Sequence, residues 1–211
     1  MTVRVAVLAS GSGTNLQALI DARHNNTLTC DIVCVVTDNP SAGAIERAER
    51  AGITSVVVKK DASESRQQYD TRLATTLQSL NVDLVVLAGF MRLLSMAFLG
   101  QFPMRVVNLH PALPGEFPGT HAIGRAFDEK QSGRTASGVM VHFVPDEGVD
   151  DGPVIVTQQV PLFVTDSLDD FTQRMHEAEH VLIVSAVQQI VNDIESLSFT
   201  AHSQSSKEVS P

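Results

Sequence analysis

Long apolar runs are absent from the sequence, and this absence excludes a membrane-spanning helix. No stretch approaches the roughly 20 consecutive apolar residues that a helix needs to cross a bilayer. The first apolar run, residues 3–9, is too short for the core of a secretory signal peptide and leads directly into Gly11 and Gly13. We therefore expect a cytoplasmic protein that has no membrane partner.

Cysteine is also scarce, since Cys30 and Cys34 are the only two. Both lie in or beside an apolar run, so we expect buried, reduced thiols and not a disulfide framework. Positive charge is in deficit as well: 15 lysines and arginines face 24 aspartates and glutamates, which gives a formal net charge of -9. Such a surface repels phosphate backbones, which excludes nucleic acid as a general partner but leaves room for a local pocket that binds one phosphate.

The rest of the composition is typical of a folded globular chain. Hydrophobic residues make up 43% and charged residues 18% of the 211 residues, which is enough for one domain with a substantial core. Apolar, β-branched runs alternate with amphipathic segments. The expected strands are 3–9, 31–37, 53–58, 82–88, 106–110, 138–144 and 154–161, and the expected helices are 16–23, 42–51, 63–80, 121–131 and 167–197, with a short helix within 89–101. This order predicts an α/β fold, a doubly wound and mostly parallel sheet with a C-terminal strand pair and a long C-terminal helix. From Ser198 onward the Ser-rich, polar composition predicts a disordered tail, residues 198–211.

The stretch 105–119 holds the candidate reaction centre. Asn108 and His110 alternate along an expected strand, so their side chains point to the same side of the sheet. Pro111 cannot donate to a sheet ladder and ends the strand, and open parallel sheets bind ligands at such carboxyl ends. Taken alone, the two residues could equally be a satisfied polar pair at the end of a strand.

An acidic loop, residues 146–153, gives this pair a chemical use. A carboxylate placed beside His110 would favour the imidazolium ring and raise its pKa, while Asn108 could donate to a developing oxyanion. Together these groups suit acyl-type transfer, in which a tetrahedral intermediate forms and protons move. The alternative is that the loop is only a charged hairpin tip.

The glycine-rich turn at residues 10–15, Ser-Gly-Ser-Gly-Thr-Asn, follows an expected strand and precedes an expected helix. Its backbone N–H groups and the helix N-terminus can bind an anion. Leu16 stands where a dinucleotide fingerprint has its third glycine, so a nicotinamide site that uses Asp38 has weak support. We favour phosphate binding over a tight connection that binds nothing.

Residues 176–180 match the H-E-x-x-H pattern of zinc peptidases, with His176, Glu177 and His180 on an expected helix. Helical spacing places both histidines on one face, as zinc requires. No persuasive third ligand follows, and Glu195 is a weak candidate. We therefore expect no metal and keep a zinc hydrolase as a remote alternative.

Arg66 and Arg92 could each bind an anionic part of a substrate, although single arginines on helices are usually solvated. Beside Arg92, the side chains of Met91, Leu93 and Leu94 could line a flat apolar pocket or pack in the core beneath the loop. From the residues alone we favour solvated arginines and core packing over a binding site.

Four separated motifs resemble those of the phosphoribosylglycinamide formyltransferases, a folate-dependent family of purine synthesis. They are GSGTNLQALI, AGFMRLL, NLHPALPGEFPG and VDDGPVI, and the resemblance runs in order from Val3 to Glu179. It implies a Rossmann-like formyltransferase fold and the transfer of a formyl group, without a metal, from 10-formyltetrahydrofolate to the amine of 5′-phosphoribosylglycinamide. These two small molecules are the partners that the resemblance implies.

The resemblance also implies roles for individual residues. His110 would be the general acid and base, Asn108 would donate to the formyl oxygen, and Asp150 would raise the pKa of His110. Positions that bind the phosphorylated substrate match Gly13, Thr14, Asn15 and Glu179. Positions that bind the folate match Arg66, Met91, Arg92, Leu93, Leu94, Asn108 and the loop 144–152.

The sequence departs from the family pattern in three places. The proline after the histidine motif stands one residue early, in Pro114-Gly115, and the loop 146–153 is one residue longer. Met140 stands where a small polar residue is usual. These departures concern the loop geometry and the folate site more than the reaction.

Other activities stay open on the sequence alone. A formyltetrahydrofolate hydrolase would use the same three residues on water, although no regulatory domain fits before Val3. Initiator-tRNA formylation is disfavoured by the acidic charge, and a non-catalytic phosphate-binding module is a further alternative. We expect a single domain, residues 1–197, with phosphate binding in 1–103 and the catalytic loop and folate site in 104–197. A homodimer is compatible with this arrangement.

Overall fold

The computed structural model describes the chain from residue 2 to residue 205, and its side chains as far as residue 197. One seven-stranded sheet forms the centre, in the order β3-β2-β1-β4-β5-β6-β7. Its strands are β1 (Arg4–Leu8), β2 (Asp31–Thr37), β3 (Ser55–Val57), β4 (Leu84–Leu87), β5 (Val106–His110), β6 (Ala136–Phe143) and β7 (Val154–Pro161). The first five strands are parallel, and β6 and β7 are antiparallel to their neighbours. The predicted mostly parallel sheet with a C-terminal strand pair is confirmed.

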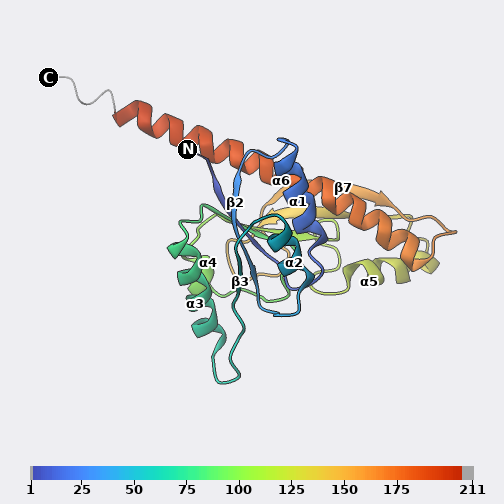
Figure 1. The fold of residues 1–211 in the computed structure, drawn as a ribbon. Coiled ribbons are helices and arrows are strands. Elements are labelled where there is room, and N and C mark those ends of the chain that lie inside the picture. Colours follow the sequence, from blue (N-terminus) through green and yellow to red (C-terminus); the bar gives the residue numbers. More distant parts are fainter. Residues whose placement is uncertain (1, 206–211) are drawn as a thin grey trace.

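Helices cover both faces of the sheet (Figure 1). They are α1 (Thr14–His24), α2 (Gly43–Arg50), α3 (Arg66–Ser79), α4 (Met96–Leu99), α5 (Ala122–Asp128) with the 3-10 turn η1 (Glu129–Ser132), and α6 (Leu168–Ser205). Figure 1 shows α3 and α4 on one side of the sheet and α1, α2 and the long α6 on the other. The order of strands and helices is the doubly wound one that the sequence predicts.

The continuous apolar run of β1 serves two cores because its side chains alternate between the faces. Val5 and Val7 belong to the core beneath α1, α2, α5 and α6, whereas Ala6 and Leu8 belong to the core beneath α3 and α4. All four are at most 1% exposed. A strand buried on both faces needs such a run, and this explains the lack of polar alternation in the first residues of the chain.

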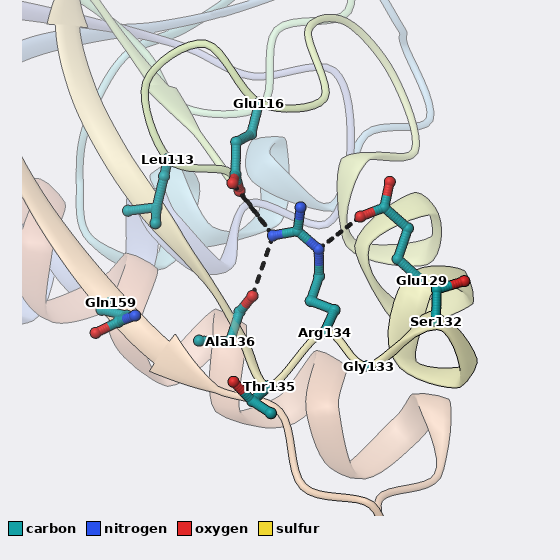
Figure 2. A pocket seen from close by; sticks show the side chains of 9 residues that line it. All are labelled: Leu113, Glu116, Glu129, Ser132, Gly133, Arg134, Thr135, Ala136 and Gln159. Carbon is teal, nitrogen blue, oxygen red and sulfur yellow. Dashed lines mark hydrogen bonds and ion pairs between the residues drawn. The ribbon is translucent and has the colours of Figure 1, made fainter.

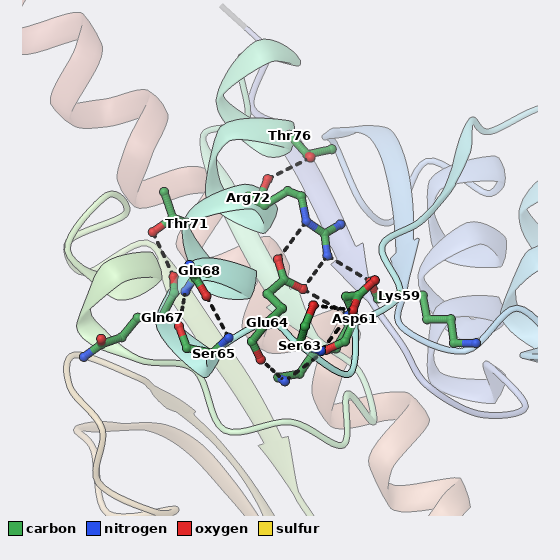
Figure 3. Close-up of polar contacts among 11 residues, drawn as sticks. Lys59, Asp61, Ser63, Glu64, Ser65, Gln67, Gln68, Thr71, Arg72 and Thr76 are labelled. Carbon is green, nitrogen blue, oxygen red and sulfur yellow. Dashed lines mark hydrogen bonds and ion pairs between the residues drawn. The ribbon is translucent and has the colours of Figure 1, made fainter.

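Helix α3 begins later than the sequence predicts, at Arg66 and not at residue 63. Ser65 is its N-cap: the Ser65 hydroxyl accepts from the backbone N–H of Gln68, and the Gln68 side chain accepts from the backbone N–H of Ser65 (Figure 3). Ser63 lies in the preceding turn and donates to the Asp61 carboxylate. This capping box sets the start of the helix.

Helix α6 ends later than predicted, and this corrects the boundary at residue 198. The helix continues to Ser205, and residues 206–211 of the expected disordered tail lie outside the described residues. No glycine or proline occurs between residues 198 and 205 to stop the helix. Serine content alone was therefore a poor signal for the helix end.

Helix α5 is shorter than the predicted 121–131. His121 precedes it with a left-handed φ of 59°, and after Asp128 the chain continues as the 3-10 turn η1 up to Gly133. The tighter turn brings the chain round into β6.

Both cysteines are buried and free, as the sequence predicts. Burial raises the pKa of the Cys30 thiol to about 12 and that of the Cys34 thiol to about 11, so both stay protonated and poorly reactive. Between residues 2 and 205, no helix has the length and apolar character that crossing a membrane requires.

Candidate active site

A cavity of about 860 Å³ lies at the carboxyl ends of β1, β4 and β5, where the sequence places the candidate reaction centre. Its lining comes from the glycine-rich turn after β1, the segment after β4, the end of β5, the start of α5, the loop between β6 and β7, and α6. Most of the predicted site residues line it: Gly13, Thr14, Asn15, Met91, Arg92, Leu93, Leu94, Asn108, His110, Asp150 and Glu179. Elements far apart in the chain thus meet at one edge of the sheet.

The structure brings Asn108, His110 and Asp150 into direct contact. Asp150 Oδ2 lies 3.3 Å from His110 Nδ1, and Asp150 Oδ1 accepts from Asn108 Nδ2 at 3.0 Å. The backbone N–H of Gly119 donates to Asp150 Oδ2 at 2.7 Å. The acidic loop therefore reaches the histidine, and it is more than a charged hairpin tip.

His142 is a fourth polar side chain at this point, and the sequence analysis missed it. It pairs with Asn108 in the antiparallel register of β5 and β6. Its Nε2 lies 3.2 Å from Asn108 Nδ2 and 3.5 Å from Asp150 Oδ1, while its Nδ1 faces the carbonyl of Phe143 at 2.8 Å. Because a carbonyl only accepts, Nδ1 carries a proton, and Nε2 can then accept from Asn108. The sequence around His142 predicts a strand, but it does not predict the register of β5 and β6 that brings His142 to Asn108.

The protonation of His110 differs from the expectation. Burial lowers the pKa of this imidazole, and the Asp150 carboxylate and the Phe117 carbonyl only partly oppose it, so the pKa lies below its ordinary value. The effect of Asp150 has the predicted sign, but burial of the residue, which is only 3% exposed, outweighs it. For Asp150 itself, burial raises the pKa, yet the contact with His142 and the hydrogen bond from the backbone of Gly119 outweigh it and leave the pKa below the ordinary range.

The glycine-rich turn forms the opposite end of the cavity. Gly13 has a left-handed φ of 74°, and a Cβ there would lie 2.8 Å from the Cα of Ala44, so only glycine fits. Gly13 is the N-cap of α1, and the first backbone N–H groups of this helix have no hydrogen-bond acceptor within the helix. Asn15 Nδ2 donates to Glu179 Oε2 at 3.1 Å. Burial raises the pKa of the Glu179 carboxyl, and the hydrogen bond from Asn15 opposes this only in part.

The segment after β4 forms an exposed apolar wall. Met91 is 69% and Leu93 57% exposed, whereas Leu94 is buried. Arg92 pairs with Asp38 at 3.2 Å and lies over the Tyr69 ring, so its guanidinium already has protein partners. The wall is therefore available for an apolar ligand surface and is not simply core.

Arg66 does not line the cavity. Its guanidinium donates to the carbonyls of Leu93 and Leu94, at 3.0 and 2.8 Å, and pairs with Glu147 at 3.2 Å. Glu147 also accepts from the backbone N–H of Met96 at 2.9 Å. Arg66 thus joins the apolar wall to the loop between β6 and β7 from behind.

The H-E-x-x-H segment divides between two environments. His176 and Glu179 line the cavity, but His180 does not. Among residues 2–205, no group of three or more histidine, cysteine, aspartate or glutamate side chains could hold a metal ion. The zinc hydrolase alternative finds no support in this donor set.

Comparisons with known proteins indicate the family of this chain. Residues 3–187 match the model of the formyl transferase family. A phosphoribosylglycinamide formyltransferase of Schizosaccharomyces pombe is 42% identical over 92% of this chain and 99% of its own length. The solved structure of a Geobacillus kaustophilus glycinamide ribonucleotide transformylase superposes with a TM-score of 0.85, at 36% identity over 90% of this chain and all of that one.

A longer relative shares only one part with this chain. The trifunctional purine biosynthetic protein adenosine-3 of Drosophila melanogaster is 44% identical over 90% of this chain, which spans 14% of that protein. The resemblance inferred from the four sequence motifs is thereby confirmed over most of the chain. This chain belongs to the formyl transferase family.

Proposed function

We propose that the protein transfers the formyl group of 10-formyltetrahydrofolate to the amine of 5′-phosphoribosylglycinamide, a step of purine synthesis. The observation that carries the proposal is the contact of Asp150 with both His110 and Asn108 inside the cavity. The family match and the full-length relatives named phosphoribosylglycinamide formyltransferase support it. The cavity is also large enough to bind two small molecules side by side.

The glycine-rich turn would bind the phosphate of the ribotide. Gly13 precedes α1 and Thr14 is its first residue, so their backbone N–H groups lie at the positive end of the helix. This end favours a bound dianion. Glu179 orients Asn15 through their hydrogen bond and faces the same cavity, where it can accept from a donor group of the ribotide. This end would therefore set the affinity for the phosphorylated substrate.

The apolar wall would bind the folate. Met91 and Leu93 offer an exposed apolar surface above the buried Leu94, and Arg92 adds a fixed cation beside it. Arg66 would act from outside the cavity, on the anionic tail of the folate or through the carbonyls that it holds. The loop 144–152 closes the same side of the cavity.

Between the two ligands, the amine nitrogen would attack the formyl carbon. The new carbon–nitrogen bond forms first and gives a tetrahedral intermediate; the bond between the formyl carbon and the folate N10 then breaks, and one proton passes from the amine to N10. Asn108 would turn one of its two N–H groups, which face Asp150 and His142 in the free protein, to the oxyanion of the tetrahedral intermediate, and His110 would carry the proton. A lowered pKa leaves His110 largely neutral near pH 7, ready to accept the proton, while Asp150 stabilises the ring once it is charged. Holding both substrates in place would supply much of the remaining rate enhancement.

Incubation of the purified protein with both substrates tests the proposal. We expect formylglycinamide ribotide and tetrahydrofolate to form in equal amounts. Chromatography measures the first product, and the change in folate absorbance measures the second. A folded protein that forms neither product would contradict the proposal. Release of formate without the amine substrate would instead indicate the hydrolase.

Three further expectations stay predictions of the same proposal. Residues 1–103 would bind the phosphate, and residues 104–197 would provide the catalytic loop and most of the folate site, although one sheet runs through both parts. A cytoplasmic location and a homodimer also stay predictions, and sedimentation at micromolar concentration would test the second.

A further inference from the structure

A second, smaller hollow of about 490 Å³ lies between η1, the first residues of β6 and the loop 111–121 that joins β5 to α5 (Figure 2). Arg134 lies at its centre. Its Nη1 donates to both carboxylate oxygens of Glu116, at 3.0 and 3.2 Å, and to the carbonyl of Ala136 at 3.1 Å. Its Nε donates to Glu129 at 2.7 Å. Two of its three nitrogens thus bind protein groups, and the carboxylates of Glu116 and Glu129 balance its charge, so the hollow is better suited to hold the loop than to bind an anion.

Phe117, the residue after Glu116, contacts two arginines, Arg134 and Arg125. The guanidinium carbons of Arg134 and Arg125 lie 4.8 and 5.7 Å from the centre of the Phe117 ring. Arg125 also donates to the carbonyls of Phe117 and Pro118, at 2.6 and 2.7 Å. Phe117 has a left-handed φ of 45°, which a bulky side chain adopts only where its surroundings enforce it. The two guanidinium groups and the Glu116 ion pair are the contacts that can enforce it here.

The backbone of Phe117 also contacts His110, the proposed proton carrier. The carbonyl of Phe117 lies 3.1 Å from His110 Nε2, on the opposite side of the ring from the Asp150 carboxylate. The charged and titratable groups that face this ring are Asp150 from the loop after β6, His142 from β6, and Arg125 from α5, which shares the Phe117 carbonyl. A neutral ring can donate to one of these two acceptors and the protonated ring to both, so the loop 111–121 helps to orient the ring and favours its protonated form.

We propose that Arg134 is a positioning residue for the formyl transfer: by binding Glu116 and stacking on Phe117, it holds the loop 111–121 so that the Phe117 carbonyl orients the ring of His110. The inference rests on the proposed function, in which His110 carries the proton. Arg134 is outside the large cavity and touches neither substrate position. Its effect passes through the backbone of Phe117.

An NMR titration of the His110 ring tests this directly and needs no turnover. The Phe117 carbonyl favours the protonated ring, so loosening it in Arg134→Gln should move the pKa of His110 downward. A merely electrostatic effect has the opposite sign, because the variant loses a positive charge and leaves Glu116 and Glu129 without a partner. A downward shift therefore supports positioning, and an unmoved or upward shift overturns it. Comparison with His110→Gln assigns the resonance.

Arg72→Gln is the matched control. Arg72 also bonds a carboxylate through two nitrogens, with Nε and Nη2 donating to Glu64 at 3.0 and 2.8 Å, but it does so on α3, away from the cavity (Figure 3). Loss of this pair should leave the His110 titration and the kinetics unchanged. An equal shift in both variants would mean that any lost surface ion pair suffices, and would overturn the inference.

Phe117→Leu supplies a second, neutral variant if Arg134→Gln fails to fold. It keeps the apolar bulk but removes the ring face on which both guanidinium groups lie, and it changes no charge, so the same downward shift is expected. In turnover assays both variants should lose roughly threefold to tenfold in kcat with little change in either KM, and Arg134→Lys should lose less. A wild type that forms no product while the titration still shifts would refute the proposed function alone.

Discussion

Two carboxylates face the same cavity from its two ends, Glu179 buried and Asp150 half-buried, and their pKa values shift in opposite directions. Glu179, beside the glycine-rich turn, has one hydrogen bond, from Asn15, and its pKa is raised. Asp150, at the catalytic end, receives hydrogen bonds from Asn108 and the backbone of Gly119 and faces a histidine, and its pKa is lowered.

The difference teaches that depth of burial and the number of donors together decide the charge of a carboxylate in this cavity, since Glu179 is the more deeply buried and has fewer donors. One donor leaves Glu179 inclined to hold a proton, which suits a group that contacts a ligand. Several donors keep Asp150 ionised, which suits a group that stabilises an imidazolium. We therefore expect changes at the glycine-rich end to alter substrate affinity and changes at the catalytic end to alter turnover.

The largest effect should follow from His110→Ala. Removing the side chain proposed to carry the proton should lower kcat by about 10³-fold, within the range for general acid–base catalysis, with KM little changed. Steady-state kinetics with both substrates measures it, and circular dichroism checks the fold. Retained turnover would break the comparison, since the catalytic end would then not govern the chemistry.

Asp150→Asn should follow, with a fall in kcat of roughly 10²-fold. The carboxylate favours the protonated ring of His110, so its loss should also move the pKa of His110 further down, and the acidic limb of the rate profile with it. The pH dependence of kcat/KM between pH 5 and 9 measures this. Asp151→Asn is the control, because that neighbouring side chain does not line the cavity and should have little effect.

Asn15→Ala tests the other end and should act on binding. Glu179 would lose its one hydrogen-bond donor, so its pKa should rise further and the substrate contact should weaken. We expect KM for the phosphorylated substrate to increase about tenfold, with kcat within a factor of about two. Gln17→Ala, on the same helix but bonded to Arg47 and Asp21, is the control. An equal loss of kcat in Asn15→Ala would erase the distinction between the two ends.

The local parts of this site were predictable from sequence, because neighbouring residues determine them. The alternation of Asn108 and His110 placed both on one side of β5, and Gly13 marked a turn that only glycine can make. The order of strands and helices was also sufficient for the mostly parallel sheet.

The non-local parts were not predictable, because they depend on register and burial. His142 meets Asn108 only through the pairing of β6 with β5, and the Phe117 carbonyl reaches His110 only through a left-handed residue in the loop 111–121. The sign of the His110 pKa shift needed the exposure of its ring, which no motif carries. The four motifs were thus sufficient to predict the family but not the contacts that surround His110.

The smallest expected effect concerns stability and separates the two catalytic groups by pH. The folded-state pKa of His110 lies below its ordinary value of 6.5, so below that pH the unfolded chain binds the proton first and the free energy of unfolding falls. The stabilisation is complete above pH 6.5 and is lost as the pH drops toward the folded-state pKa. For Asp150 the loss begins only below its ordinary value of 3.8. Urea unfolding between pH 7 and 5 should therefore show a shallower pH dependence in His110→Asn than in the wild type, and no change of slope in Asp151→Asn. An equal or steeper slope in His110→Asn would mean that Asp150 raises the pKa of His110 at least as much as burial lowers it. The lowered pKa of His110 would then be contradicted.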